Sequence, residues 1–469
     1  MRCPSVKAVV WFVGALAIVS VTLLFLARSR KPALPQMMWD AEPDVPAWAG
    51  QRKDEPFDVK QFLESRAAPP DNAAPLYFAA LAELGPEMYA SNLPPGHAWP
   101  WHWPSPPHVR ALAVSIDGAC DAEKLRSGAV PPAEVERLLA AAGPGLTWID
   151  EAQQKPRCVF ITGSMLPHIQ PSRVFARLAT IQLHHARTKG DFDEAEQAIR
   201  RTLRLARDVR PRGFMVTQAV SISMDGILLS GIGDFTLSQP GLKPSDCDRL
   251  LALLAEHQQQ SLPLAEEGLR LEYVTMRNEI EALRDGRRSP RELAQLVGDN
   301  TPALKDRDLA NLDWEMEAAA CNRVFAACLA VAARPYHEIL SGRLTEKPNA
   351  DLRAEKAVLI RLVAPAWDAL LPAAARHQAQ LAGTQCLVAV RRFELAHGTP
   401  PADLETAVRE ANMTSVPIDP YSGQPMRYRV VDGKPRVYSL GPDQKDDGGL
   451  VPWNLAPGAP GDYLFQIGP

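Results

Sequence analysis

The sequence predicts a mainly α-helical protein with a single membrane-spanning helix at the N-terminus and a small α+β module at the C-terminus. Three observations predict this. An uncharged apolar run lies near the N-terminus, amphipathic helical patterns fill most of the chain, and the clearest hairpin pattern comes after Pro425. We therefore divide the chain into an anchor (1–31), a Pro-rich stalk (32–56), a large helical domain (57–378) and a C-terminal module (379–469).

Length and charge narrow the classes of function. At 469 residues the chain is long enough to bury a large core and to hold more than one domain. With 51 basic and 55 acidic residues, the net charge of -4 gives no field that would attract nucleic acid, so no nucleic-acid partner is expected. The seven cysteines lie far apart, without a CxxC pair. They are predicted to be small buried hydrophobes. The alternative is that one or two disulfides form among them.

The anchor is the run from Ala8 to Ala27, which contains no charged residue. A helix of this length spans about 30 Å, the thickness of the hydrocarbon core of a bilayer. A cleaved signal peptide is the main alternative, because Arg2 and Lys7 precede the run. The basic segment 28–31 is instead typical of the stop after an uncleaved anchor. The flanking charges nearly balance, so they do not decide the orientation.

Two Pro-rich segments follow the anchor. Residues 32–56 contain five prolines and are predicted to form an extended stalk. The segment from Leu93 to Val109 combines prolines with three tryptophans and three histidines. It could bind a sugar or a metal. We favour a stiff loop clamped onto the helical domain, because no carboxylate or cysteine accompanies the histidines.

The helical domain is predicted from repeated amphipathic patterns. In the segment DFDEAEQAIRRTLRLA, which starts at Asp191, the apolar side chains fall on one face and the charged side chains on the other. Asp191 and Asp193 suit the N-terminus of a helix. Residues 173–209, with small side chains around Gly190, resemble one tetratricopeptide-type hairpin. No second copy follows at the period of that repeat, so an array is not predicted.

No catalytic motif is found along the chain. The sequence lacks HExxH, GxSxG, SxxK, a Walker A loop and a GxGxxG with a following acidic residue. We therefore expect a non-enzymatic protein, and we assign no catalytic residues.

The C-terminal module begins with a helix whose apolar residues cover more than one face, ending at Gly398. A short helix over 401–412 and a turn precede the strands. Asp432 and Gly433 are typical of a two-residue type I′ turn between two strands. We expect Tyr428 and Val430 on the face that packs on the long helix. The intervening arginines would lie in water.

This succession of a long helix, an Asp-Pro-aromatic turn, a hairpin and the acidic stretch YSLGPDQKDDGG resembles the C-terminal globular half of the type II secretion major pseudopilin. The likeness covers about 379–455. In that family the acidic loop binds calcium, and the resemblance therefore implies a calcium site. The residues in question are Leu440, through its carbonyl, Asp443, Asp446 and Asp447. The alternative is a solvated acidic turn.

The predicted function follows from the anchor, the absent motifs and this resemblance. We expect a non-enzymatic, single-pass membrane protein of the cell envelope, with its large domain outside the cytoplasm. Its helical domain and pseudopilin-like module would contact a protein partner in secretion or envelope assembly. The alternative is an envelope enzyme with a site in the helical domain near the Trp/His-rich loop. A deep pocket with converging titratable groups would favour that alternative.

Overall fold

The structure is a computed structural model. It describes residues 45–84, 107–160, 168–287, 289, 312–340, 344–345, 348–349, 357, 359–360, 367–450, 452 and 460–468. These residues belong to one compact unit, Ala41–Pro469. The predicted anchor and the Trp/His-rich loop up to residue 106 lie outside the described residues.

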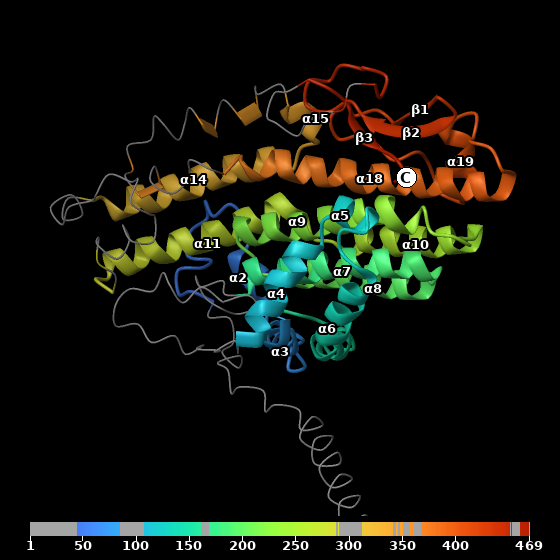
Figure 1. Ribbon diagram of the computed structural model, residues 1–469. Coiled ribbons are helices and arrows are strands. Elements are labelled where there is room, and N and C mark those ends of the chain that lie inside the picture. Colours follow the sequence, from blue (N-terminus) through green and yellow to red (C-terminus); the bar gives the residue numbers. More distant parts are fainter. Residues whose placement is uncertain are drawn as a thin grey trace, which may run out of the picture. The chain divides into compact units, whose positions relative to one another are not determined.

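The helical prediction is confirmed for the described residues, which are mainly helical with a small antiparallel sheet (Figure 1). The helices of the N-terminal half are α2 (Val59–Ser65), α3 (Ala74–Leu84), α4 (Pro107–Ala119), α5 (Ala122–Arg126), α6 (Pro132–Gln153), α7 (Ile169–Lys189) and α8 (Phe192–Asp208). Those that follow are α9 (Met215–Gly231), the π-helical turn η1 (Ile232–Thr236), α10 (Pro244–Gln260), α11 (Leu264–Arg284), α14 (Trp314–Ala332), α15 (Tyr336–Ile339), α18 (Leu370–His397) and α19 (Leu404–Glu410).

The predicted helical hairpin at Gly190 is confirmed. Gly190 adopts φ 67° as the C-cap of α7, a conformation that glycine reaches without strain. The Asp191 side chain then accepts a hydrogen bond from the backbone N–H of Glu194 and caps α8. The predicted apolar face of α8 is buried, including Ala195 and Ile199, both fully inaccessible to solvent.

The centre of the helical domain is α9 with η1. Met215–Thr236 is, within the described residues, the one helical stretch long and apolar enough to cross a membrane. More than half of its most apolar part is buried inside the domain. It packs against α7, α8, α11 and α18. Because this stretch is enclosed by other helices, it serves as a core helix in the structure.

The long helix α18 lies between two layers. The small sheet and α19 pack on one side of it, and α9 and α10 pack on the other (Figure 1). This explains why α18 is buried on several sides, as its apolar pattern predicts. It ends at Gly398, which adopts φ 74°. The helix runs unbroken through residues 378 and 379, so it belongs to both the helical domain and the C-terminal module.

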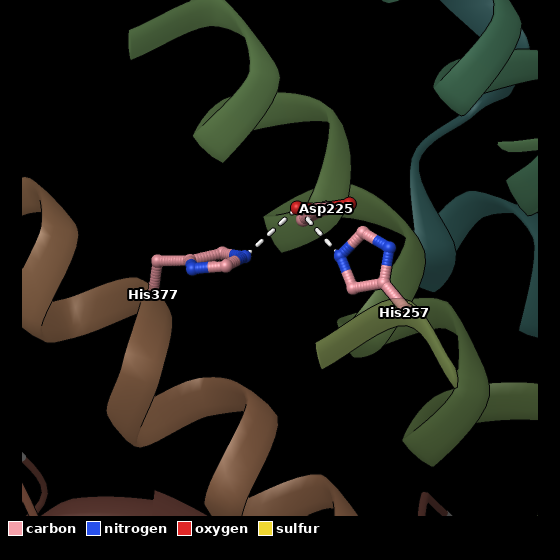
Figure 2. A group of neighbouring side chains, drawn as sticks. All are labelled: Asp225, His257 and His377. Carbon is pink, nitrogen blue, oxygen red and sulfur yellow. Dashed lines mark hydrogen bonds and ion pairs between the residues drawn. The ribbon is translucent and has the colours of Figure 1, made fainter. Parts of the chain in front are cut away.

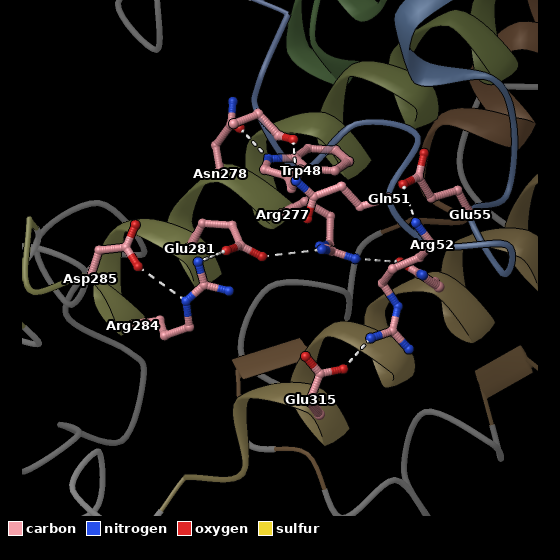
Figure 3. A network of polar contacts seen from close by, with 12 residues as sticks. Trp48, Gln51, Arg52, Glu55, Arg277, Asn278, Glu281, Arg284, Asp285 and Glu315 are labelled. Carbon is pink, nitrogen blue, oxygen red and sulfur yellow. Dashed lines mark hydrogen bonds and ion pairs between the residues drawn. The ribbon is translucent and has the colours of Figure 1, made fainter.

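Residues 45–56, the described part of the predicted stalk, pack on α11 and α14 (Figure 3). Trp48 is buried and donates a 2.8 Å hydrogen bond from Nε1 to Asn278 Oδ1. The guanidinium of Arg277 lies 4.7 Å from the centre of the Trp48 ring. Arg52 also pairs with Glu315 of α14. The chain is therefore joined to the helical domain well before residue 57.

The sheet contains β1 (Arg427–Val431), β2 (Lys434–Ser439) and β3 (Tyr463–Phe465), in the order β1-β2-β3 and antiparallel throughout. The predicted hairpin register is confirmed, since Val430 pairs with Pro435 and Tyr428 with Val437. Asp432 and Gly433 adopt φ 51° and 73°, as a type I′ turn requires.

One expectation for this hairpin is wrong. Val430 does not share the buried face, because its side chain is 42% exposed. The reason is that α18 packs mainly on β2 and β3, whereas β1 is an edge strand beside them. Burial therefore decreases from β2 to β1.

The cysteines behave mainly as buried hydrophobes. Of the described cysteines, Cys158, Cys247, Cys321, Cys328 and Cys386 are buried and Cys120 is half-buried. All six are free thiols. No disulfide therefore contributes to the described part of the fold.

Candidate functional site

A buried carboxylate at the centre of the helical domain gathers three donors on one oxygen atom. Asp225 Oδ2 lies 2.6 Å from Nη2 of Arg210, 2.8 Å from Nε2 of His377 and 3.1 Å from Nε2 of His257. Figure 2 shows the two imidazole rings meeting the carboxylate from opposite sides. All four residues are at most 5% exposed, so water does not screen these contacts.

Three helices bring the group together. Asp225 belongs to α9, His257 to α10 and His377 to α18. On α9, Ser221 and Asp225 are four residues apart and therefore share one face, which turns towards these neighbours. Gln380 of α18 lies close to Gly226: it donates a 2.9 Å hydrogen bond to the Gly226 carbonyl, and a Cβ at this position would lie 3.3 Å from its Oε1. The packing of the helices positions every member of the group.

His257 is held as a neutral donor. Nη1 of Arg207 lies 3.2 Å from its Nδ1. Arginine can only donate, so Nδ1 is the acceptor and the ring proton sits on Nε2, facing Asp225. Burial lowers the pKa of His257, with the charge of Arg210 adding to that effect, although Asp225 opposes the shift. The neutral tautomer fits this direction.

The neighbouring side chains keep the carboxyl group of Asp225 ionised. Burial alone would raise the pKa of this carboxyl, but its contacts with His257, His377 and Arg210 outweigh burial and hold the pKa well below the ordinary value. Oδ1 of the same carboxylate is buried and has no hydrogen-bond partner. Asp225 is therefore an ionised side chain whose position depends on three donors at its other oxygen.

Two members of the group line a large cavity. Arg210 and His377 form part of the wall of a space of about 1360 Å³ between α10, α18, the start of α11 and the loop at 411–418. Because Nε2 of His377 is bound to Asp225, Nδ1 is the ring nitrogen left for a ligand. Of the described residues, none accepts a hydrogen bond from Nη1 of Arg210. Two buried polar side chains, Arg210 and His377, thus lie in the wall of the cavity and can contact a ligand.

The same side chains can be tested as a metal site. Their ligand atoms lie within 4.8 Å of one another, and two imidazoles with one carboxylate can bind zinc or iron. A metal-bound imidazole, however, normally donates a hydrogen from its other nitrogen. In His257 that nitrogen accepts from Arg207, and Arg210 brings a second cation to the carboxylate. The geometry therefore fits a hydrogen-bonded network better than a metal centre.

The predicted calcium ligands lie together in one loop, but their carboxylates do not converge. Asp446 accepts hydrogen bonds from Tyr438 and the N–H of Gly448, and Asp443 accepts one from the N–H of Lys445. In the described chain, the one group of three or more acidic, histidine or cysteine side chains with ligand atoms within 4.8 Å is that of Asp225. Calcium at Leu440, Asp443, Asp446 and Asp447 stays a prediction.

A fourth carboxylate, not found from the sequence, lies next to this loop. Asp462 is buried and accepts a 2.7 Å hydrogen bond from the N–H of Gly449. Burial raises its pKa to about 6, and the charges of Asp446 and Asp447 add to that rise. Asp462 Oδ1 and Asp443 Oδ2 are both buried without hydrogen-bond partners.

No motif in the sequence indicates the Asp225 group. The two histidines occur singly, without the i, i+4 spacing of a metal motif, and Asp225 and His377 are 152 residues apart. One signal was available. Asp225 is the single charged residue in the stretch from Met215 to Gly233, where an unpaired carboxylate would be costly.

Comparison with known proteins identifies no relative of this chain: no family model, curated protein or solved structure matches it.

Proposed function

We propose that the chain is a membrane-anchored binding protein whose helical domain takes up a small molecule in the cavity above Arg210 and His377. The observation that carries this proposal is the placement of two buried polar side chains in the wall of a 1360 Å³ cavity. A concave space that combines apolar side chains with a few polar groups is a common form of ligand site. The membrane anchor is the predicted run from Ala8 to Ala27.

The proposal is tested by filling the cavity. Ala255 on α10 lines the cavity and is exposed, so a tryptophan there would occupy ligand space without displacing core side chains. Gln259, on the same helix, is exposed and does not line the cavity, which makes Gln259→Trp the matched control. The full chain is purified in detergent and screened against small molecules by thermal shift, and co-purified molecules are identified by native mass spectrometry.

We expect the wild type and Gln259→Trp to retain or bind a small molecule, and Ala255→Trp to lose it. Ligands that bind all three proteins equally would contradict the proposal. So would a wild type that carries no small molecule and responds to none in the screen.

A second role is supported for the C-terminal module, which we propose binds one calcium ion and contacts a protein partner in envelope assembly. The buried oxygens of Asp443 and Asp462 without hydrogen-bond partners support an ion there. The exposed apolar side chains of Ile418, Val430 and Leu450 support a protein contact. A calcium ion would neutralise the negative charges of these acidic residues and would hold the loop to the sheet.

Calcium binding is tested by isothermal titration of the full chain, with Asp462→Asn as the variant and magnesium as the control ion. We expect calcium-dependent heat for the wild type, a strong reduction for the variant and a lower melting temperature after adding a chelator. Absence of heat and of a chelator effect would leave this loop as an ordinary acidic turn. Affinity capture from solubilised membranes with the wild type and with Val430→Asp would test the protein contact.

A further inference from the structure

We infer that the ligand of the cavity is an apolar molecule that ends in one carboxylate, of the acyl or aryl carboxylic acid class, with the carboxylate at Arg210 and the apolar body along the walls. This inference rests on the proposed function and specifies the ligand of the same cavity. Three features carry it: the unused donor of Arg210, the remaining nitrogen of His377 and the composition of the walls.

Arg210 supplies a buried cation in the wall of the cavity. Its side chain is 1% exposed, and it donates from Nε to Ser221 at 2.8 Å and from Nη2 to Asp225 at 2.6 Å. Two of its three nitrogens are thus held in place, while Nη1 has no acceptor in the described chain. A guanidinium held in this way presents a fixed donor to a planar anion, for which a carboxylate has the matching shape.

The balance of charge favours an acidic ligand over a basic one. Asp225 serves Arg210 and two imidazoles with a single oxygen, and His257 already uses its proton in that contact. His377 contacts Asp225 through Nε2, which leaves Nδ1 as the ring nitrogen that can contact a ligand beside Arg210. An amine would meet the guanidinium of Arg210, whereas Asp225, whose Oδ1 is unpaired, is not among the residues that line the cavity.

The walls provide an apolar surface much larger than a carboxylate needs. The side chains that form them include Leu251, Leu264, Ile339, Leu371, Leu381 and Ile418. The acidic groups at the rim are already paired, with Asp248 2.5 Å from Arg392 and Glu266 3.3 Å from Arg270. A small inorganic anion would leave these walls wet, whereas a hydrocarbon body would cover them.

The inference is tested on the full chain in detergent with four probes: octanoate, butyrate, octanol and octylamine. Isothermal titration is made with the wild type and, to subtract partition into the detergent, with Ala255→Trp. We expect octanoate to bind at least tenfold more tightly than octanol, and octylamine to bind no better than octanol. Each CH₂ added between butyrate and octanoate should increase affinity about three- to fourfold where the chain is fully buried.

Two variants address the carboxylate end. Arg210→Lys keeps the charge and removes the fork, and His377→Gln keeps a donor to Asp225 and removes the ring. Each should lower the affinity for octanoate at least tenfold and change that for octanol less than threefold. Circular dichroism and the melting temperature establish whether each variant is folded. The wild-type comparison of the four probes remains decisive if a variant does not fold.

The outcomes separate this inference from the proposed function. Equal affinity for octanoate and octanol, lost in Ala255→Trp, would overturn the carboxylate and leave the binding cavity standing. Tighter binding of octylamine would overturn it in the same way. No binding of any probe would overturn the inference, and the screen with Ala255→Trp would then decide the proposed function independently.

Discussion

Asp225 shows how much one side chain can organise in a helical protein. Its charge is paired with the guanidinium of Arg210, and both side chains are almost completely buried. Removing one partner of a buried pair leaves the other charge without compensation, which is far more costly than losing a surface pair. The binding proposal also depends on Asp225, because it holds Arg210 and His377 in place.

We therefore predict that Asp225→Asn lowers the free energy of unfolding by about 3–5 kcal/mol. Chemical denaturation of the full chain would measure the change. Asp248→Asn is the control, since Asp248 pairs with Arg392 at the surface and should contribute less than about 1 kcal/mol. Similar losses of unfolding free energy for the two variants would show that Asp225 does not form a buried ion pair with Arg210.

His168 should make the protein sensitive to mild acid. Its ring is 1% exposed and stacks on Phe160 with 4.0 Å between ring centres, and burial lowers its pKa to about 3. The unfolded chain binds a proton near pH 6.5, whereas the folded chain does not until about pH 3. Stability therefore falls as the pH drops from 6.5 towards 3, and this residue has no effect at higher pH.

The prediction for His168 is that the wild type loses roughly 2 kcal/mol more than His168→Leu when the pH is lowered from 7 to 5. Urea denaturation at the two pH values measures both losses. Because each protein is compared with itself at pH 7 and pH 5, the effect of the substitution on stability at neutral pH cancels. Equal losses would mean that His168 is accessible to protons in the folded state.

At the scale of elements, the contact between α18 and the sheet depends on one glycine. A Cβ atom at Gly383 would lie 2.3 Å from the Phe465 ring of β3, far inside van der Waals contact. The missing side chain lets the ring lie directly on α18. We predict that Gly383→Ala destabilises the protein by about 1–3 kcal/mol, although alanine is the better helix former.

The matched control for this prediction is Gly118→Ala in α4, where a Cβ would meet nothing within 4 Å. That substitution should be neutral or should stabilise the protein by up to about 1 kcal/mol. Thermal denaturation of the two variants gives the comparison. A stabilising Gly383→Ala would mean that the helix and the sheet are not in close contact at this point.

At the scale of the whole molecule, the predicted anchor would hold the helical domain and its cavity at a membrane. We predict that the full chain stays in the membrane pellet after carbonate extraction, because the uncharged run from Ala8 to Ala27 is long enough to span the bilayer. A chain lacking residues 1–31 should be released to the supernatant. Release of the full-length protein would show that the run is not a membrane anchor.

The orientation across the membrane needs its own measurement. The resemblance to a pseudopilin predicts that the large domain lies outside the cytoplasm, while the flanking charges favour neither side. Protease added to intact spheroplasts should digest the domain in that orientation. A fully protected domain would place it, and the cavity, on the cytoplasmic side.

Sequence alone determined the elements whose cause is local. The αL glycines at 190 and 398, the apolar face of α8 and the type I′ turn at Asp432 each depend on residues a few positions apart. The exposure of Val430 was predicted wrongly, because it depends on where α18 packs on the sheet. A period of two or 3.6 residues specifies a face and not the surface that meets it.

The candidate site was decided by the tertiary structure. Arg210 lies just after α8, whereas Asp225, His257 and His377 come from three further helices. No spacing in the sequence relates the four residues. They meet because apolar faces of α9, α10 and α18 pack together. The polar side chains within those faces must then find partners, since water cannot reach them. Local chemistry determined the helices, and their packing brought these four side chains together and placed two of them, Arg210 and His377, in the wall of the cavity.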